Sequence, residues 1–192
     1  MWLAAGTLIV LGGTGVALIP WSRETSITIF FEEDTAWYQQ LLIGTVFGFV
    51  TARAGWGIVE MPFMAETRIF FIDIIKPLKL SWPEILFVSV CAGIGEEILF
   101  RGAAQPFLGI WTTAIIFVLL HGYLNPFNVS MSIYGIYLTV VIGVMGYLTE
   151  YFGIITAIVA HTVIDVYLLY ELSGAELQPD YQQDKDENND PE

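Results

Sequence analysis

The chain has 192 residues, of which 55% are hydrophobic and 15% aromatic, and only 14% of them are charged. Soluble globular domains contain about 25% charged residues, so this composition excludes an ordinary soluble domain and predicts a membrane protein. The net charge is −13, and no basic segment is interleaved with aromatic residues, which argues against a nucleic-acid partner.

Six apolar stretches predict a polytopic, all-α bundle of about six transmembrane helices in the cell membrane. Most approach the roughly 20 residues that a spanning helix needs, although the fourth is short, so five or seven helices stay open. The first has no Lys or Arg before it and is too long for the apolar part of a signal peptide, so we expect a retained helix. The predicted helices cover residues 2–21, 37–59, 82–106, 107–122, 131–151 and 153–173.

The distribution of charge predicts an orientation and a tail. The connection at 60–81 carries Arg68, Lys76 and Lys79, and an excess of Lys and Arg in short loops marks the cytoplasmic side. With six helices, both termini are then cytoplasmic. We divide the chain into an integral membrane domain at 1–175 and an acidic tail at 176–192, whose polar composition predicts disorder.

Three charged residues, Glu96, Glu97 and Arg101, interrupt the third apolar stretch. Each costs roughly 3 kcal/mol at the centre of a membrane helix, so such residues indicate a functional site. Glu97 and Arg101 are four residues apart on one helix face and are predicted to form an ion pair. Glu96 points about 100° away from Glu97 and is left to face a cavity.

The chain contains two histidines, and both fall in predicted membrane helices. His121 follows Phe117 by one turn, so we expect Phe117 to form a wall of the same cavity. His161 precedes Asp165 by one turn, and Asp165 could orient the imidazole or act beside it. Each residue alone has a structural explanation, such as a hydrogen bond to a neighbouring helix. Together, these groups on three membrane helices predict a functional site.

Two kinds of chemistry fit this set of residues. A carboxylate can take a proton from water, and imidazoles can polarise a carbonyl group. Glu96, His121 and His161 also match a zinc ligand set, although the HExxH motif of soluble zinc proteases is absent. The sequence leaves the use of a metal, and therefore of zinc as a cofactor, open.

These residues resemble three ordered motifs of the CAAX prenyl protease/Abi family of intramembrane proteases, the CPBP family. The resemblance covers residues 82–172 and rests on the order and spacing of the motifs rather than on any single one. The motifs are Glu96-Glu97-x-x-x-Arg101, Phe117-x-x-x-His121 and His161-x-x-x-Asp165.

The resemblance implies an endopeptidase that hydrolyses peptide bonds at or within the membrane. By motif position, it implies that Glu96 activates the attacking water with help from His121, while His161 and Asp165 stabilise the oxyanion. Family members have been described both as metalloproteases and as metal-independent glutamate proteases, and we favour the glutamate type. The implied partners are membrane lipid and a peptide or membrane-protein substrate, prenylated or not.

The resemblance also leaves alternatives open. It implies that Glu97 and Arg101 hold the helix in place, but eukaryotic members have eight spans and often carry Asn where this chain has Asp165. An ionised Asp cannot donate a hydrogen bond to an oxyanion. Many prokaryotic relatives are linked to bacteriocin self-immunity, so a non-catalytic immunity or scaffold protein is one alternative. A proton-coupled transporter is another, although we find no internal repeat.

The geometry of the third and fourth helices presents a difficulty. A straight helix that starts near Pro83 places Glu96 about 20 Å deep, whereas a complete return helix would carry His121 to the cytoplasmic face. Several glycines and Pro106 lie between the two residues. They allow a break or a re-entrant turn, which membranes tolerate where the backbone lines a cavity. Either such an interruption lies between Glu96 and His121 or the predicted topology is wrong, and we give the motif more weight than the topology.

Overall fold

The computed structural model describes residues 1–23 and 34–175. Over these residues the protein is entirely helical, without a β-strand, which confirms the predicted fold class. Four helices are long and apolar enough to cross a membrane, and a shorter apolar helix covers Ile110–Leu120. The predicted acidic tail and most of the first connection lie outside the described residues.

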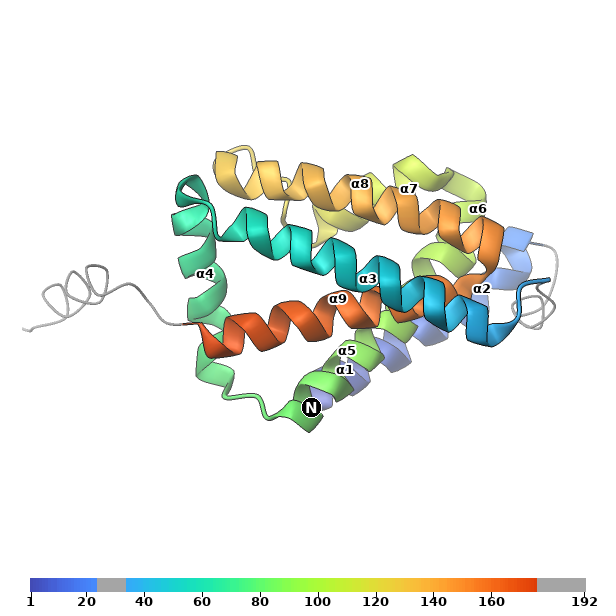
Figure 1. Cartoon of the computed structure of the whole chain (residues 1–192). Helices are drawn as coiled ribbons and strands as arrows, with labels where there is room; N and C mark the ends of the chain where they lie inside the picture. Colours follow the sequence, from blue (N-terminus) through green and yellow to red (C-terminus); the bar gives the residue numbers. More distant parts are fainter. Residues whose placement is uncertain (24–33, 176–192) are drawn as a thin grey trace, which may run out of the picture.

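The long helices follow the predicted apolar stretches closely, whereas the helix at Ala65–Ile75 lies in the predicted connection 60–81 and was not expected. The first span is made of α1 (Trp2–Thr7), a π-helical segment (Leu8–Gly12) and α2 (Gly13–Arg23). The others are α3 (Trp37–Val59), α4 (Ala65–Ile75), α5 (Trp82–Glu97), α6 (Gln105–Leu108), α7 (Ile110–Leu120), α8 (Val129–Phe152) and α9 (Ile154–Gly174). Short 3₁₀ segments at Pro62–Met64 and Lys76–Leu78 flank α4, which lies across one end of the bundle (Figure 1).

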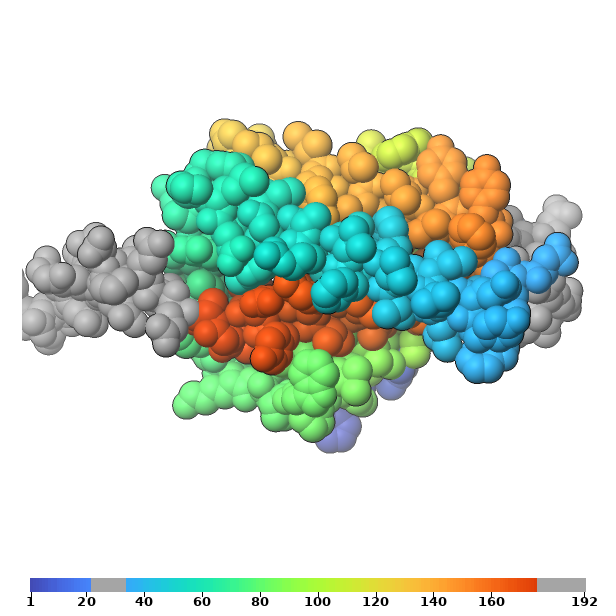
Figure 2. Space-filling view, viewed as in Figure 1, coloured from blue at the N-terminus to red at the C-terminus, as the bar shows by residue number. Residues whose placement is uncertain are grey.

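Helix α9 packs against α3 on one side and α5 on the other, and it also contacts α8. Figure 2 shows α9 at the surface between α3 and the start of α5. Gly48 explains the close approach of α3 to α9, because a Cβ atom there would lie 2.6 Å from the carbonyl oxygen of Ala160. The Gly44–Gly48 pair is therefore a helix-packing motif, and it fixes the helix that carries His161 and Asp165.

Two interruptions decide the depth at which the site residues meet. Helix α5 continues into a π-helical segment, Ile98–Ala104, and then into α6, and the chain reverses at Gly109 with φ = 76°. That positive φ favours glycine, which has no Cβ atom. The path from Glu96 to the turn rises by about 18 Å, and α7 returns by about 17 Å. His121, directly after α7, therefore returns to the depth of Glu96.

The connection from His121 to Asn128 runs without helix back to the end of the bundle where α4 lies. The side-chain oxygen of Asn128 then accepts a hydrogen bond of 2.8 Å from the backbone N–H of Met131 and caps α8. The fourth helix is thus shorter than its predicted range of 107–122, and His121 lies just beyond it rather than within it. The expected interruption between Glu96 and His121 is confirmed.

The orientation of the chain is internally consistent. The end of α9 lies beside α4, and Met1 lies beside the start of α5 (Figure 1), and Lys76 Nζ donates a hydrogen bond of 2.9 Å to the carbonyl oxygen of Ala175. This is the end that the excess of Lys and Arg assigns to the cytoplasm. The assignment of that end to the cytoplasm stays a prediction.

Candidate active site

The structure brings together the four residues that the sequence nominated for chemistry. Glu96 Oε2, from α5, lies 3.3 Å from His121 Nε2 and 4.0 Å from His161 Nε2. Asp165 Oδ2 lies 3.6 Å from the same His161 Nε2. Residues from α5, α9 and the end of α7 therefore converge within hydrogen-bonding reach of one water molecule.

Glu97 lies on the other side of α5, in a fully buried polar network. Its Oε2 atom lies 3.3 Å from Arg101 Nε, and its Oε1 atom lies 2.8 Å from His161 Nδ1. Arg101 also donates a hydrogen bond to the carbonyl oxygen of Ile142 on α8. The predicted ion pair is present, and it ties α5 to α8 and α9. Glu97 therefore positions His161 as well as pairing with Arg101.

The partners of the two imidazoles determine which nitrogen faces Glu96. His161 Nδ1–H donates to the Glu97 carboxylate, and His121 Nδ1, at 2.7 Å from the carbonyl oxygen of Phe117, donates to that carbonyl. A carbonyl oxygen only accepts hydrogen bonds, so the tautomer follows from this partner. Both Nε2 atoms are consequently turned toward Glu96. Each can accept a proton when the ring is neutral and can donate one when the ring is an imidazolium.

Phe117 lies at the centre of the aromatic wall of the site. Its ring stacks on His121 with centroids 4.3 Å apart, meets His161 edge-on at 5.8 Å, and lies 5.6 Å from the guanidinium carbon of Arg101. This single side chain fixes the planes of both histidines and screens the buried ion pair. The structure thus places Phe117 where its spacing from His121 predicted.

A cavity of about 160 Å³ lies between these groups. Glu96, His121, His161 and Asp165 line it together with Phe117, whereas Glu97 does not. Glu97 is 0% exposed and Glu96 is 8% exposed. The two adjacent carboxylates therefore face different surroundings, as their 100° separation on a helix requires. We call this space the catalytic pocket.

Glu96 Oε2 is buried and makes no ordinary hydrogen bond to any described residue. Glu97 Oε2 is buried in the same way, so the missing hydrogen bond does not by itself distinguish Glu96. Its position beside two imidazole nitrogens and a cavity does, and it fits the acceptor of a proton from water. Within residues 1–23 and 34–175, no group of three His, Cys, Asp or Glu side chains is arranged to hold a metal ion, so we derive no step through a metal.

Some features of the site have no local signal in the sequence. The hydrogen bond between His161 and Glu97 joins residues 64 positions apart, and only the order of the motifs suggested their meeting. Two tyrosines, Tyr123 and Tyr134, also line the catalytic pocket. Their position depends on the non-helical connection after α7, which apolar periodicity does not predict.

The fold and the polar cluster are those of a helical membrane protein with a group of carboxylates and imidazoles inside its bundle, and comparison with known proteins shows what this part of the chain is similar to. Residues 78–167 match the family described as type II CAAX prenyl endopeptidase, Rce1-like. This segment contains all seven motif residues. This segment is therefore similar to CAAX-type prenyl endopeptidases, and the match covers just under half of the chain.

A curated relative matches over a similar length. A segment of 89 residues is 33% identical to the uncharacterised protein YpbD of Bacillus subtilis, and the match covers 45% of this chain and 44% of the relative. The chain therefore spans less than half the length of that protein. No solved structure matches significantly.

Proposed function

We propose that this protein is an intramembrane endopeptidase in which Glu96 activates water for attack on a peptide bond. The observation that carries the proposal is the convergence of Glu96 Oε2 with the Nε2 atoms of His121 and His161, at 3.3 and 4.0 Å, beside a buried cavity. The match of residues 78–167 to the Rce1-like prenyl endopeptidases supports the same class of reaction.

The hydrolysis begins with a proton transfer from water. Glu96 takes one proton while His121 Nε2, whose ring is fixed through Phe117, accepts a hydrogen bond from the same water and orients it. The water oxygen forms a bond to the peptide carbonyl carbon, and the carbonyl oxygen becomes an oxyanion. Glu96 then gives its proton to the leaving nitrogen as the C–N bond breaks. The products are a carboxylic acid and an amine.

His161 is the group placed to stabilise the oxyanion. Three carboxylates approach it, with Glu97 at 2.8 Å, Asp165 at 3.6 Å and Glu96 at 4.0 Å. This negative surrounding favours an imidazolium, which carries a proton on Nε2 as well as on Nδ1. Nε2–H can then donate to the oxyanion. In this scheme Asp165 stays ionised and stabilises the imidazolium rather than donating a hydrogen bond itself.

The test uses purified protein in proteoliposomes and a set of apolar, single-span peptides with and without a farnesyl group. We expect wild-type protein to cleave members of this set and Glu96→Gln, His121→Ala and His161→Ala to abolish cleavage. Glu66→Gln, an exposed carboxylate on α4, is the matched control and should leave cleavage unchanged. Mass spectrometry of the products identifies the cleaved bond.

Two results would overturn the proposal. Normal cleavage by Glu96→Gln would refute the role of this carboxylate. Protection of cells against a bacteriocin that survived all three substitutions, with no cleavage by the wild type, would instead favour a non-catalytic immunity protein.

A further inference from the structure

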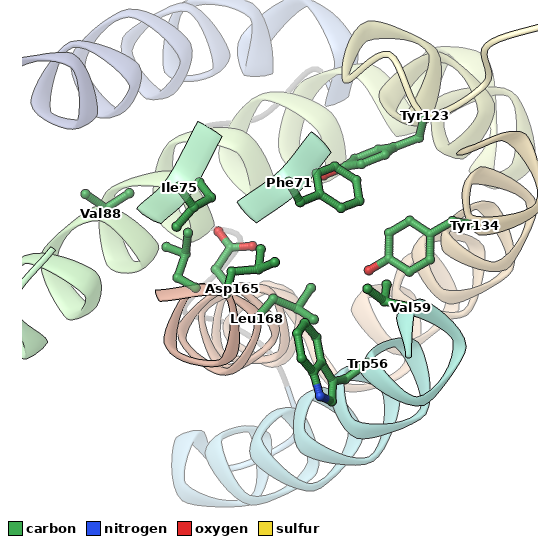
Figure 3. Close-up of a pocket in the computed structure, with 11 residues that line it drawn as sticks. Trp56, Val59, Phe71, Ile75, Val88, Tyr123, Tyr134, Asp165 and Leu168 are labelled. Carbon is green, nitrogen blue, oxygen red and sulfur yellow. The ribbon is translucent and has the colours of Figure 1, made fainter. Parts of the chain in front are cut away.

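A second cavity adjoins the catalytic pocket, with a volume of about 250 Å³. The two share Tyr123, Tyr134, Asp165 and Leu168. The remaining walls come from α3, α4, α5 and α9 and are apolar, with Phe71 and Ile75 contributed by α4 (Figure 3). We call this space the apolar cavity. It lies beside the proposed reaction site, from which these four shared residues separate it.

Two tyrosine side chains, Tyr123 and Tyr134, lie at this boundary. Tyr134 is 3% exposed as a residue, its hydroxyl end is directed into the cavity (Figure 3), and its side chain makes no hydrogen bond to any described residue. Tyr123 is partly buried and likewise makes no side-chain hydrogen bond within the described residues. Neither hydroxyl oxygen is fully enclosed by protein atoms. Both hydroxyls are therefore available to a ligand that enters the cavity.

The arrangement of the rings connects this boundary to the catalytic pocket. Tyr123 lies parallel to His121, with an interplanar angle of 3° and centroids 6.1 Å apart. It meets Tyr134 edge-on at 5.8 Å. The next ring, Tyr137, stacks on Tyr134 at 6.1 Å, but its hydroxyl donates a hydrogen bond to the carbonyl oxygen of Thr51. Tyr137 is therefore a structural counterpart of Tyr134 within the same stack.

The chemistry of the boundary fits a peptide group followed by an apolar side chain. The phenols can donate to a carbonyl oxygen, and Asp165 can accept from an amide N–H. The apolar walls beyond them exclude a charged or strongly polar group. The volume is below the roughly 300 Å³ at which pockets for small molecules begin. The cavity is therefore sized for one side chain rather than for an independent small molecule.

We propose that Tyr134 and Tyr123 bind a backbone carbonyl of the substrate next to the cleaved bond, and that the apolar cavity receives the adjoining side chain. This inference rests on the proposed peptidase function and names the part of the protein that selects its substrate. Tyr134 and Tyr123 are substrate-binding residues here. They take no part in the proton transfers assigned to Glu96.

The first test removes single hydroxyl groups. In proteoliposomes with a cleaved apolar peptide, Tyr134→Phe should raise KM about tenfold and leave kcat within about twofold, because one hydrogen bond that does not change during the reaction is lost. Tyr137→Phe should leave both constants unchanged and lower only the thermal stability. Equal kinetic effects from the two substitutions, or none from Tyr134→Phe, would overturn the inference.

The second test fills the cavity from α4. The probes are two peptides that differ only in Leu or Ala at the residue beside the cleaved bond. Ile75→Trp, which projects into the cavity, should abolish the preference for Leu. Ile74→Trp, on the exposed face of the same helix, should preserve it. An unchanged preference in Ile75→Trp would contradict the assignment of this cavity.

A binding measurement distinguishes a failure of this inference from a failure of the proposed peptidase function. The same two peptides are titrated into the Glu96→Gln protein, alone and combined with Tyr134→Phe. If the Leu peptide binds about tenfold more tightly and Tyr134→Phe removes the difference, the cavity is a binding site even if the wild type cleaves nothing. If the wild type cleaves both peptides and binding shows no difference, the peptidase stands and the inference fails. Weak, equal binding without cleavage contradicts both.

Discussion

The two sides of α5 offer a comparison between two polar regions built from adjacent residues. On one side, Glu97 is 0% exposed and is held by Arg101 and His161. On the other, Glu96 lines the catalytic pocket. The Oε2 atoms of both residues are buried without an ordinary hydrogen bond, so the two carboxylates differ in their surroundings: Glu97 pairs with Arg101 inside the bundle, and Glu96 faces a cavity. We interpret the first region as structural support and the second as the place of the proposed chemistry.

His161 is the link between these two regions. Its Nδ1 atom belongs to the buried network and its Nε2 atom faces the catalytic pocket. The support that Glu97 provides therefore acts on the reaction through the orientation of one ring. Substitutions in the buried network should therefore change mainly stability, and substitutions in the catalytic pocket should change mainly cleavage.

The largest effect on stability is expected from removing the buried cation. Arg101→Met removes the guanidinium partner of the buried Glu97 and leaves His161 as its remaining partner among the described residues, and breaking a buried ion pair costs about 3–5 kcal/mol. The free energy of unfolding in mixed micelles measures it. Arg53→Met, at an exposed position on α3, is the matched control and should change that free energy by less than about 0.5 kcal/mol. Equal effects from both would show that the network does not stabilise the fold.

Substitutions of the two histidines should differ in their effect on stability but not in their effect on cleavage. His161→Gln breaks a charge-assisted hydrogen bond to Glu97, so we expect a loss of about 1.5–3 kcal/mol in the free energy of unfolding together with a loss of cleavage. His121→Gln should lose cleavage while the stability falls by no more than about 1 kcal/mol, because its short hydrogen bond goes to a carbonyl within its own turn and its contact with Glu96 is longer, at 3.3 Å. Identical stability losses would contradict the assignment of His161 to both regions.

A smaller effect is expected at Asp165. Asp165→Asn preserves the shape of the side chain but removes a charge beside His161 Nε2, so we expect kcat to fall by about tenfold. Asp165→Ala should reduce kcat further, because it also removes the hydrogen-bonding group. An increase in kcat with Asn would indicate that this position donates a hydrogen bond to the oxyanion directly.

The smallest effect is expected from metal removal. The proposed steps use only side chains, so dialysis against a strong chelator should leave cleavage unchanged, with metal content measured on the same sample. Loss of cleavage on dialysis and its recovery on addition of Zn²⁺ would contradict the glutamate mechanism. That result would assign Glu96, His121 and His161 as ligands.

The sequence predicted the long helices well because each is a continuous apolar run with clear boundaries. Helix α3 has the predicted bounds, and α8 and α9 differ from prediction by one or two residues at each end. The pairing of Glu97 with Arg101 was also predictable, because it is set by helical spacing alone. The same spacing correctly separated Glu96 from that ion pair.

The other features of the fold and site depend on backbone geometry that the spacing of apolar residues does not predict. The π-helical segment Ile98–Ala104 contains no residue pattern that distinguishes it from an α-helix, and only the turn at Gly109 had a signal in the glycine and proline content. The Gly44–Gly48 motif indicated helix packing but not that α9 was the partner. The hydrogen bond from His161 to Glu97 joins segments far apart in the chain and required the folded structure.

The most direct test of the division between the two carboxylates measures cleavage and unfolding on the same preparations of Glu96→Gln and Glu97→Gln. We predict that Glu96→Gln lowers kcat by about 10²–10⁴-fold, the range for loss of a general base, with unchanged stability. Glu97→Gln should unfold more readily by about 3–5 kcal/mol, because Arg101 is left uncompensated. Retained cleavage by Glu96→Gln, or unchanged stability of Glu97→Gln, would contradict the account.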